Sequence, residues 1–279
     1  MIILLGFLTL LVVFFGFALG GRQGMMVAFC FACLINFGAW WFSDKILLSM
    51  YRAQPLAEEE APEVFEIVRK LSEKAGIPMP KLFMLPSASA NAFATGRDPQ
   101  HAAIAVTHGI VGLLNKEELS GVLGHELAHI LNRDILLSSI VATLAGALSM
   151  IASMFRWSFF WGGERDEHDK GHPLALLLAS ILMPFVAMLI QLAISRSREY
   201  EADLGGVRLC EEPLYLASAL RKIDAASKRF PLRDAEPATA HLFIANPLSG
   251  KGWSALFSTH PSIDDRIARL EAMIHFPTN

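Results

Sequence analysis

The pattern of hydrophobic and polar positions begins with two long apolar stretches, residues 2–20 and 25–42, neither of which contains a charged residue. A helix of about 20 residues, rising about 1.5 Å per residue, covers the roughly 30 Å of a bilayer's hydrocarbon core. The second stretch ends in Trp40 and Trp41, which suit a membrane interface. The first has no Lys or Arg before it, unlike a secretory signal peptide. We therefore expect a retained hairpin of two transmembrane helices within residues 1–44.

A second pair of apolar stretches, residues 135–155 and 174–194, encloses a polar loop at 156–173. The pair predicts a second membrane hairpin over residues 135–195, in which Pro184 is a kink that spanning helices tolerate. No Gly or Pro separates the third apolar stretch from the helix expected before it. We therefore expect one long helix, or two nearly continuous ones, to enter the bilayer there.

Polar sequence fills the two remaining segments, 45–134 and 196–279. Apolar residues recur with a period of 3.6 between Leu56 and Ala75, which predicts an amphipathic helix. The predicted fold class is a mainly α integral membrane protein, in which four transmembrane helices carry an α+β domain with a short sheet. Short apolar runs flanked by Pro, Ser and Gly predict the strands of that sheet at Lys81–Leu85, Asn91–Thr95 and Ala102–Thr107.

Composition agrees with a membrane protein and argues against other classes. Of the 279 residues, 53% are hydrophobic and 18% are charged, which is more apolar than a typical soluble protein. The net charge is -3, without the excess of positive charge that nucleic-acid-binding proteins have, so we expect no nucleic-acid partner. Cys30 and Cys33 lie inside an apolar stretch, and Cys210 is the one other cysteine. This set predicts neither a zinc ribbon nor a disulfide framework.

The sequence H-E-L-A-H occurs in a segment predicted to be helical, which begins at Asn115 with Glu118 three residues later. His125 and His129 stand four residues apart, on one face of that helix, where two imidazoles can bind one Zn²⁺. Glu126 lies beside them, where a carboxylate can take a proton from metal-bound water. Because so short a motif also occurs by chance, its surroundings decide whether it binds metal.

A catalytic zinc site has three protein ligands and one open position for water, so a third ligand is expected elsewhere. Glu199 and Asp203 stand four apart on a predicted helix after the fourth apolar stretch, where one can bind metal while the other holds an imidazole or the helix in place. Glu201 points away from their face. His168 and His172 also stand four apart, but Gly, Pro and dense charge around them predict a solvated loop.

The residues around the third ligand resemble a known family. The R-x-x-E-x-x-A-D pattern of the HtpX family is matched by four residues here, Arg196, Glu199, Ala202 and Asp203. That family comprises membrane-embedded zinc proteases of bacteria and is related to the CAAX prenyl protease of eukaryotes. Residues 91–96 resemble its N-A-F-x-x-G strand, and residues 260–267 resemble its C-terminal H-P-x-x-x-x-R-I stretch. With both apolar hairpins in the family's order, the likeness covers essentially the whole chain.

The resemblance implies a role for each residue at the zinc site. His125, His129 and Glu199 would bind one Zn²⁺ per subunit. Glu126 would be the general base and would then pass its proton to the leaving amine. Asp203 would hold a ligand in place without binding the metal.

Two weaker assignments concern the substrate. Asn91 would lie on a strand beside the substrate, where an extended peptide can add as a further strand; alternatively it is a turn residue. His260 would reach the developing oxyanion; alternatively it is a loop histidine packed before Pro261.

The resemblance also implies a function. We expect a zincin-like, zinc-dependent endopeptidase that hydrolyses misfolded or damaged membrane proteins or unfolded polypeptides. It would be a multi-pass protein of the bacterial inner membrane with its catalytic domain facing the cytoplasm. Alternatives are a site-specific processing protease of the CAAX prenyl protease type and a non-catalytic membrane scaffold with structural zinc. Four spans are too few to enclose a large membrane chamber, which argues against the processing protease. A structural zinc site would be closed by four protein ligands, which argues against the scaffold.

Spacing along the chain places the expected site near the membrane. His129 lies six residues before Ile135, roughly 9 Å along a continuous helix, and Glu199 lies about 8 Å beyond the fourth stretch by the same rise. Both halves of the site are therefore expected on one face of the bilayer, close to the headgroups. We hypothesise that the substrates are membrane proteins cut close to the membrane surface.

Overall fold

The computed structural model describes residues 2–144, 196–227, 229, 242–244 and 261–274. Several expectations lie outside the described residues. These are the fourth apolar stretch, most of the third, the loop at 156–173, and His260.

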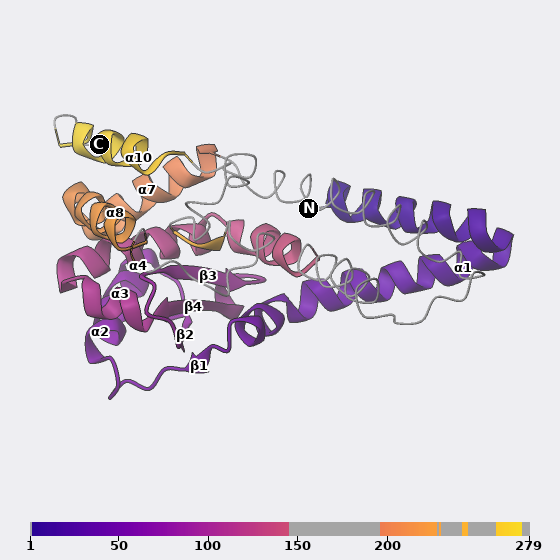
Figure 1. The fold of residues 1–279 in the computed structure, drawn as a ribbon, viewed down its shortest axis with the longest axis horizontal. Coiled ribbons are helices and arrows are strands. Elements are labelled where there is room, and N and C mark those ends of the chain that lie inside the picture. Colours follow the sequence, from indigo (N-terminus) through magenta and orange to yellow (C-terminus); the bar gives the residue numbers. More distant parts are fainter. Residues whose placement is uncertain (1, 145–195, 228, 230–241, 245–260, 275–279) are drawn as a thin grey trace, which may run out of the picture.

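The N-terminal hairpin is formed by α1 (Ile2–Met50), which is folded back on itself at Gly20 and Gly21 (Figure 1). The reversal needs glycine because Gly21 has a φ of 57° and a ψ of -142°. A Cβ on either Gly16 or Gly24 would collide with the opposite arm. The arms therefore pack closely, with the reversal between the two apolar stretches, as the sequence predicts.

The outer surface of α1 is apolar. Val27 is 70% exposed and Leu34 is 69% exposed, and phenylalanines along the hairpin are exposed in the same way. Among the described residues, Gly20–Met50 is the one helix that by itself is long and apolar enough to cross a membrane. Inside the hairpin, the Asn36 Nδ2 atom donates a hydrogen bond of 2.9 Å to Thr9 Oγ1. Apolar side chains outside and a paired polar contact inside are what a lipid environment requires.

A four-stranded sheet forms the base of the domain at the end of α1, with the strands in the order β1-β2-β4-β3. The strands β2 and β4 pair in parallel, whereas β1–β2 and β3–β4 are antiparallel. Their bounds are β1 Gln54–Pro55, β2 Lys81–Leu85, β3 Ala92–Gly96 and β4 Ala102–Thr107. The strands β2 and β4 have the predicted bounds, and β3 is shifted by one residue. β3 forms one edge of the sheet.

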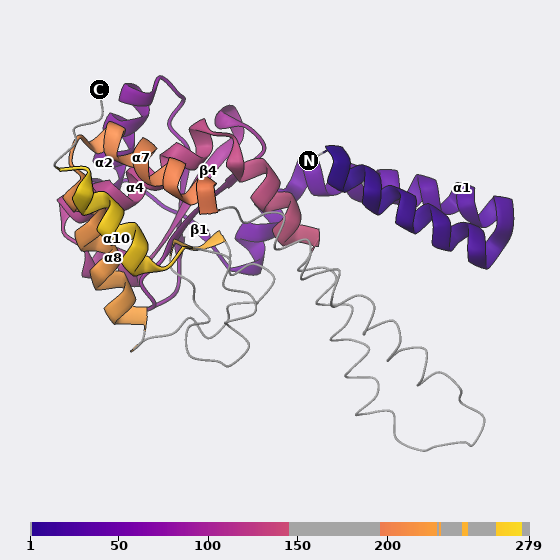
Figure 2. The same ribbon diagram turned by 90° about the horizontal axis from the view of Figure 1, so that it is seen from above.

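The helix α4 (Lys116–Leu131) lies between this sheet and a layer of other helices (Figure 2). It contacts β3 on one side and packs against helices from both polar segments. The remaining helices are α2 Pro62–Ala75, α3 His108–Leu113, α7 Arg196–Cys210, α8 Pro213–Ser227 and α10 Ile263–Ala272. Because α4 is enclosed, apolar residues on most of its sides contribute to the main core.

The amphipathic helix begins later than its periodicity predicts. The prediction started at Leu56, but α2 starts at Pro62, after turns that include Glu58, Glu59 and Glu60. Pro62 occupies the first helical turn, where its missing N–H costs nothing. The three acidic residues therefore precede the helix and do not form its first turn.

The sequence predicts one long helix, or two nearly continuous ones, after the H-E-L-A-H motif; one long helix is wrong, and the two helices that form are sharply bent. α4 ends at Leu131, and a second helix, Asp134–Leu144, starts after a two-residue break at an angle of 89°. Within the break Arg133 has a φ of 59°, a left-handed conformation that an α-helix cannot contain. The estimate of roughly 9 Å along a straight helix therefore no longer applies.

Candidate metal centre

The start of α4 is fixed by side chains before any metal is considered. Asn115 Oδ1 accepts from the Glu118 backbone N–H, and Glu118 Oε2 accepts from the Asn115 backbone N–H, which completes the predicted capping box. Glu118 is buried, where Ser218 and Lys222 of α8 also donate to its carboxylate. The register of the motif helix is thereby tied to a second helix.

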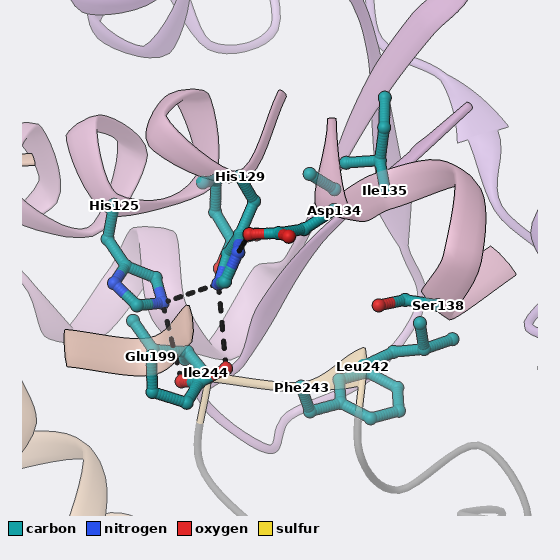
Figure 3. Close-up of a pocket in the computed structure, with 11 residues that line it drawn as sticks. His125, His129, Asp134, Ile135, Ser138, Glu199, Leu242, Phe243 and Ile244 are labelled. Atoms are coloured by element: carbon teal, nitrogen blue, oxygen red, sulfur yellow. Dashed lines mark hydrogen bonds and ion pairs between the residues drawn. The ribbon is translucent and has the colours of Figure 1, made fainter. Parts of the chain in front are cut away.

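Three side chains converge from two helices, His125 and His129 from α4 and Glu199 from α7 (Figure 3). The Nε2 atoms of the histidines lie 3.2 Å apart. Glu199 Oε2 lies 3.8 Å from His125 Nε2, and Glu199 Oε1 lies 3.6 Å from His129 Nε2. Ligands about 2.0–2.1 Å from a tetrahedral Zn²⁺ lie about 3.3 Å from one another. The triangle therefore has the size that a zinc ion needs.

Close approach of α7 to α4 brings the carboxylate into place. A Cβ on Gly206 would lie 2.8 Å from the backbone nitrogen of His125, so only glycine allows this approach. Glu199 lies on the same helix, two turns before Gly206. The third candidate ligand is thus set by backbone contact between two segments far apart in sequence.

The imidazole of His125 is oriented by a carboxylate on the side away from the other two candidate ligands. The His125 side chain is 1% exposed, and its Nδ1 lies 2.9 Å from Asp203 Oδ1, which leaves Nε2 facing the other two candidate ligands. This is the contact expected of a carboxylate that orients a metal-binding imidazole. Burial and the positive charge of Arg266 lower the pKa of His125, and the bond to Asp203 opposes them. The imidazole is therefore kept neutral, the form that binds a metal.

His129 has a carboxylate partner of its own. Its Nδ1 lies 3.2 Å from Asp134 Oδ2. Burial acts to lower the pKa of His129, but Asp134, Glu199 and Glu126 outweigh it and raise that pKa to about 9. The sharp bend after α4 brings Asp134 to this position, since five residues along a straight helix would point elsewhere. Spacing along the sequence does not predict this partner.

Glu126 faces the same pocket from α4. Burial raises the pKa of its carboxyl to about 7, against the opposing charge of His129 and a hydrogen bond from the Ala94 backbone. A carboxyl with a pKa near neutrality can both accept and release a proton under working conditions.

Arg266 is the residue that the sequence interpretation missed. It is 1% exposed, and its Nε and Nη2 donate to the two carboxylate oxygens of Asp203 at 3.0 and 2.6 Å. Its Nη1 donates to Ile244 O at 3.2 Å and lies 3.6 Å from Glu199 Oε2. Arg266 lies within residues 260–267, which resemble the H-P-x-x-x-x-R-I stretch, and nothing in the sequence distinguishes a buried arginine from an exposed one on the amphipathic α10.

The pocket at these residues is small, about 40 Å³, which is space for an ion and a water molecule. One wall is polar, and the other is apolar (Figure 3). The apolar wall comprises Ala94 of β3, Ile135 after the bend, and the segment Leu242–Ile244. The backbone N–H of Ile244 donates to Ala92 O at 3.3 Å, so this segment lies along the outer edge of β3.

The two weaker site predictions stay predictions. Asn91 immediately precedes β3 and is buried, its backbone N–H donating to Thr107 Oγ1 at 2.9 Å and its carbonyl accepting from that hydroxyl at 3.0 Å. It is not among the residues that line the pocket, whereas Ala94 is. His260 lies outside the described residues.

Comparison with known proteins gives consistent matches. Residues 58–274 match the family described as peptidase family M48. A "Protease HtpX homolog" of Syntrophobacter fumaroxidans is 54% identical over 274 residues, covering 97% of each chain. A "Protease HtpX homolog" of Pyrococcus abyssi is 51% identical over 268 residues, covering 96% of this chain and 93% of that one.

A solved structure, the "Crystal Structure of S. mikatae Ste24p", superposes with a TM-score of 0.55 and 19% sequence identity. The match covers 95% of this chain and 63% of that one, so the chain spans less than two thirds of the length of Ste24p. This likeness concerns the fold alone. The family match and the relatives together give the assignment: the chain belongs to peptidase family M48, as a metalloprotease of the HtpX type.

Proposed function

We propose that this metalloprotease binds one Zn²⁺ per chain through His125, His129 and Glu199, and that it hydrolyses peptide bonds of misfolded or damaged membrane proteins. The observation that supports this most directly is the triangle of ligand atoms, all within 4.8 Å of one another. Among the described residues the cluster has three members. A catalytic zinc site has three protein ligands and an open position for water, whereas a structural site is closed by four ligands.

The residues of the chain divide the chemical work. When bound, zinc would polarise the scissile carbonyl and make water a nucleophile near neutral pH. Glu126 accepts the proton of the attacking water and later delivers it to the leaving amine. Asp203 and Asp134 hold the two imidazoles at Nδ1, so that each Nε2 faces Glu199 and would be free to bind the ion. Arg266 balances the charge of Asp203, so that the cluster of acids around the site does not repel itself.

We also propose the membrane arrangement that the sequence predicts. Four spans, grouped as hairpins 1–44 and 135–195, would carry a zincin-like catalytic domain formed by residues 45–134 and 196–279. The protein would lie in the bacterial inner membrane with this domain in the cytoplasm. The exposed apolar surface of α1 supports contact with the bilayer.

The experiment combines a substitution with metal analysis. Purified protein with Glu126→Gln is expected to keep its zinc, measured by mass spectrometry, and to lose about 10²–10⁴-fold of its activity on an unfolded membrane protein. Wild-type protein stripped by a chelator should recover activity when zinc is added. Glu201→Gln, on the same helix as Glu199, is the matched control and should keep both properties. A Glu126→Gln protein with full activity would refute the proposal, and so would wild-type protein that needs no metal.

A further inference from the structure

The pocket at the candidate metal centre is also lined by a serine that the proposed chemistry does not use. Ser138 lies on the helix Asp134–Leu144, which follows the bend, and its side chain is half-buried. It lines the same pocket as His129 and Glu199. Figure 3 shows its hydroxyl pointing away from its own helix, towards the side of the pocket that holds the histidines. A polar group thus projects into the space that a substrate must enter.

The other hydroxyls of this helix are already bonded within the protein. Ser139 is fully buried, with its Oγ 2.8 Å from Thr95 Oγ1. Thr143 Oγ1 donates to Ser139 O at 2.8 Å, which is the usual bond of a helical hydroxyl to the carbonyl four residues before it. Ser138 makes neither kind of bond with any residue that the structure describes. Its hydroxyl therefore remains available to a molecule in the pocket.

The position of Ser138 follows from its spacing from Asp134. Residues four apart lie on one face of a helix, and four residues rise about 6 Å. Asp134 Oδ2 lies 3.2 Å from His129 Nδ1, so Ser138 lies about one turn beyond the carboxylate that orients this imidazole. The serine is therefore placed beside the metal centre and not among its three candidate ligands.

An extended peptide whose scissile carbonyl faces the three ligands has a second acceptor at a matching distance. Each extended residue covers about 3.3 Å, and successive residues face opposite sides. The carbonyl two residues from the scissile one therefore faces the same side, about 6.6 Å away, which is close to one helical turn. A serine hydroxyl can donate to such a carbonyl, whereas the side chains of Ile135 and Leu242 in the same pocket have no donor.

We propose that Ser138 binds the main chain of the substrate, by donating a hydrogen bond to the carbonyl two residues from the scissile bond. This inference rests on the proposed function and adds a substrate-binding residue to it. Every residue has a main-chain carbonyl, so the contact selects no side chain, which suits an enzyme that cleaves misfolded chains of many sequences. The bond is present before and during the reaction, so it lowers KM and leaves kcat unchanged.

The first test compares hydroxyl variants of the purified, zinc-loaded full-length enzyme on a peptide that is cut at one bond. Ser138→Ala is expected to raise KM about 2–13-fold, the value of one neutral hydrogen bond, with kcat and bound zinc unchanged. Ser138→Thr keeps a hydroxyl and should recover most of this loss. Thr143→Ala, which removes a hydroxyl bonded within the same helix, is the matched control and should leave KM unchanged.

Binding can also be measured without cleavage. In the Glu126→Gln background, which is expected not to cut the peptide, fluorescence anisotropy gives the dissociation constant directly. Adding Ser138→Ala to this background should weaken binding by the same about 2–13-fold. Thr143→Ala in the same background should bind the peptide normally.

The second test identifies the carbonyl. Peptides carry a thioamide, whose sulfur is a weaker acceptor, at one position at a time. With wild-type enzyme, a thioamide two residues from the scissile bond should raise KM about as much as Ser138→Ala does. In Ser138→Ala the same thioamide should add little further, because both changes remove one bond. Thioamides at the other positions should act equally on both enzymes.

The outcomes separate the inference from the function on which it rests. An unchanged KM in Ser138→Ala, or a fall in kcat or in bound zinc in its place, would overturn the inference and leave a zinc protease. Thioamide effects of equal size in wild type and Ser138→Ala at every position would overturn it too. Absence of zinc-dependent cleavage by the wild-type enzyme would overturn the proposed function and the inference with it.

Discussion

The two sides of the candidate metal centre each hold a histidine by a carboxylate at Nδ1, but in different surroundings. The inner side consists of Asp203 and Arg266, and the open side is the bend Asn132–Asp134. On the inner side His125 is 1% exposed, whereas His129 on the open side is 17% exposed. Each imidazole has a carboxylate at Nδ1, at 2.9 Å on the inner side and 3.2 Å on the open side.

The difference lies in the charge behind each carboxylate. Burial acts to lower the pKa of both histidines. On the inner side Arg266 adds a positive charge, and the pKa of His125 stays lowered. On the open side the charges that act on His129 are the carboxylates of Asp134, Glu199 and Glu126, and its pKa rises to about 9. His125 is therefore already in the form that binds a metal at neutral pH, whereas His129 would first have to release a proton.

The largest effect is expected from breaking the inner side. Arg266→Gln leaves Asp203 buried without its positive partner, a change that typically costs about 3–5 kcal/mol. Denaturant unfolding of the zinc-free protein should show this loss. Arg208→Gln, an exposed arginine of α7, should change the unfolding free energy by less than about 0.5 kcal/mol. An Arg266→Gln protein as stable as wild type would show that Asp203 is held by other means.

Breaking the open side should affect metal binding more than stability. Asp134→Asn removes the carboxylate that orients His129, and such losses typically weaken metal affinity about 10–100-fold. Zinc competition with a chelator measures this, above about pH 9, where protons no longer compete. Asp98→Asn, a carboxylate that pairs with the exposed His101, is the control and should bind zinc normally. Unchanged affinity in Asp134→Asn would mean that His129 is oriented by its packing alone.

The two sides also predict a pH dependence of metal affinity. Because the pKa of His129 is raised to about 9, zinc must displace a proton from it at lower pH. Affinity should therefore rise about tenfold per pH unit between about 7 and 9 and then level off. The same proton stabilises the zinc-free fold below the ordinary histidine pKa of about 6.5, and this stability is lost as pH rises to about 9. In Asp134→Asn the levelling should occur at lower pH; an unshifted curve would assign the proton to another group.

The smallest effect is expected at the bend itself. Arg133 has a φ of 59°, which costs a residue with a Cβ roughly 1–2 kcal/mol. Arg133→Gly removes that cost but adds about 0.5–1 kcal/mol of unfolded-chain entropy, so stability should rise by at most about 1.5 kcal/mol. Arg133→Ala keeps the Cβ and should be near neutral, as unfolding midpoints would show. A loss of stability in Arg133→Gly would mean that the arginine side chain itself supports the turn.

Much of the centre could be predicted because its signals are local. A four-residue spacing puts His125 and His129 on one helix face whatever surrounds the helix, and Glu199 and Asp203 are related in the same way. The capping box at Asn115 and the strands at Lys81–Leu85 and Ala102–Thr107 were likewise readable from short-range pattern. The amphipathic period placed the start of α2 too early, at Leu56. Pro62 and the turns before it override the pattern there.

What the sequence alone determined was which residues share a helix face and where the apolar stretches run, since both follow from the fixed rise of a helix. Tertiary structure decided how those faces meet. A left-handed residue at position 133 turns the chain and brings Asp134 to His129, and the approach of α7 at Gly206 carries Glu199 to the histidines. The burial of Arg266 belongs to the same class, because it depends on α10 packing over α7 and α8. No short-range rule contains these contacts, since each joins elements separated by a bend or by most of the chain.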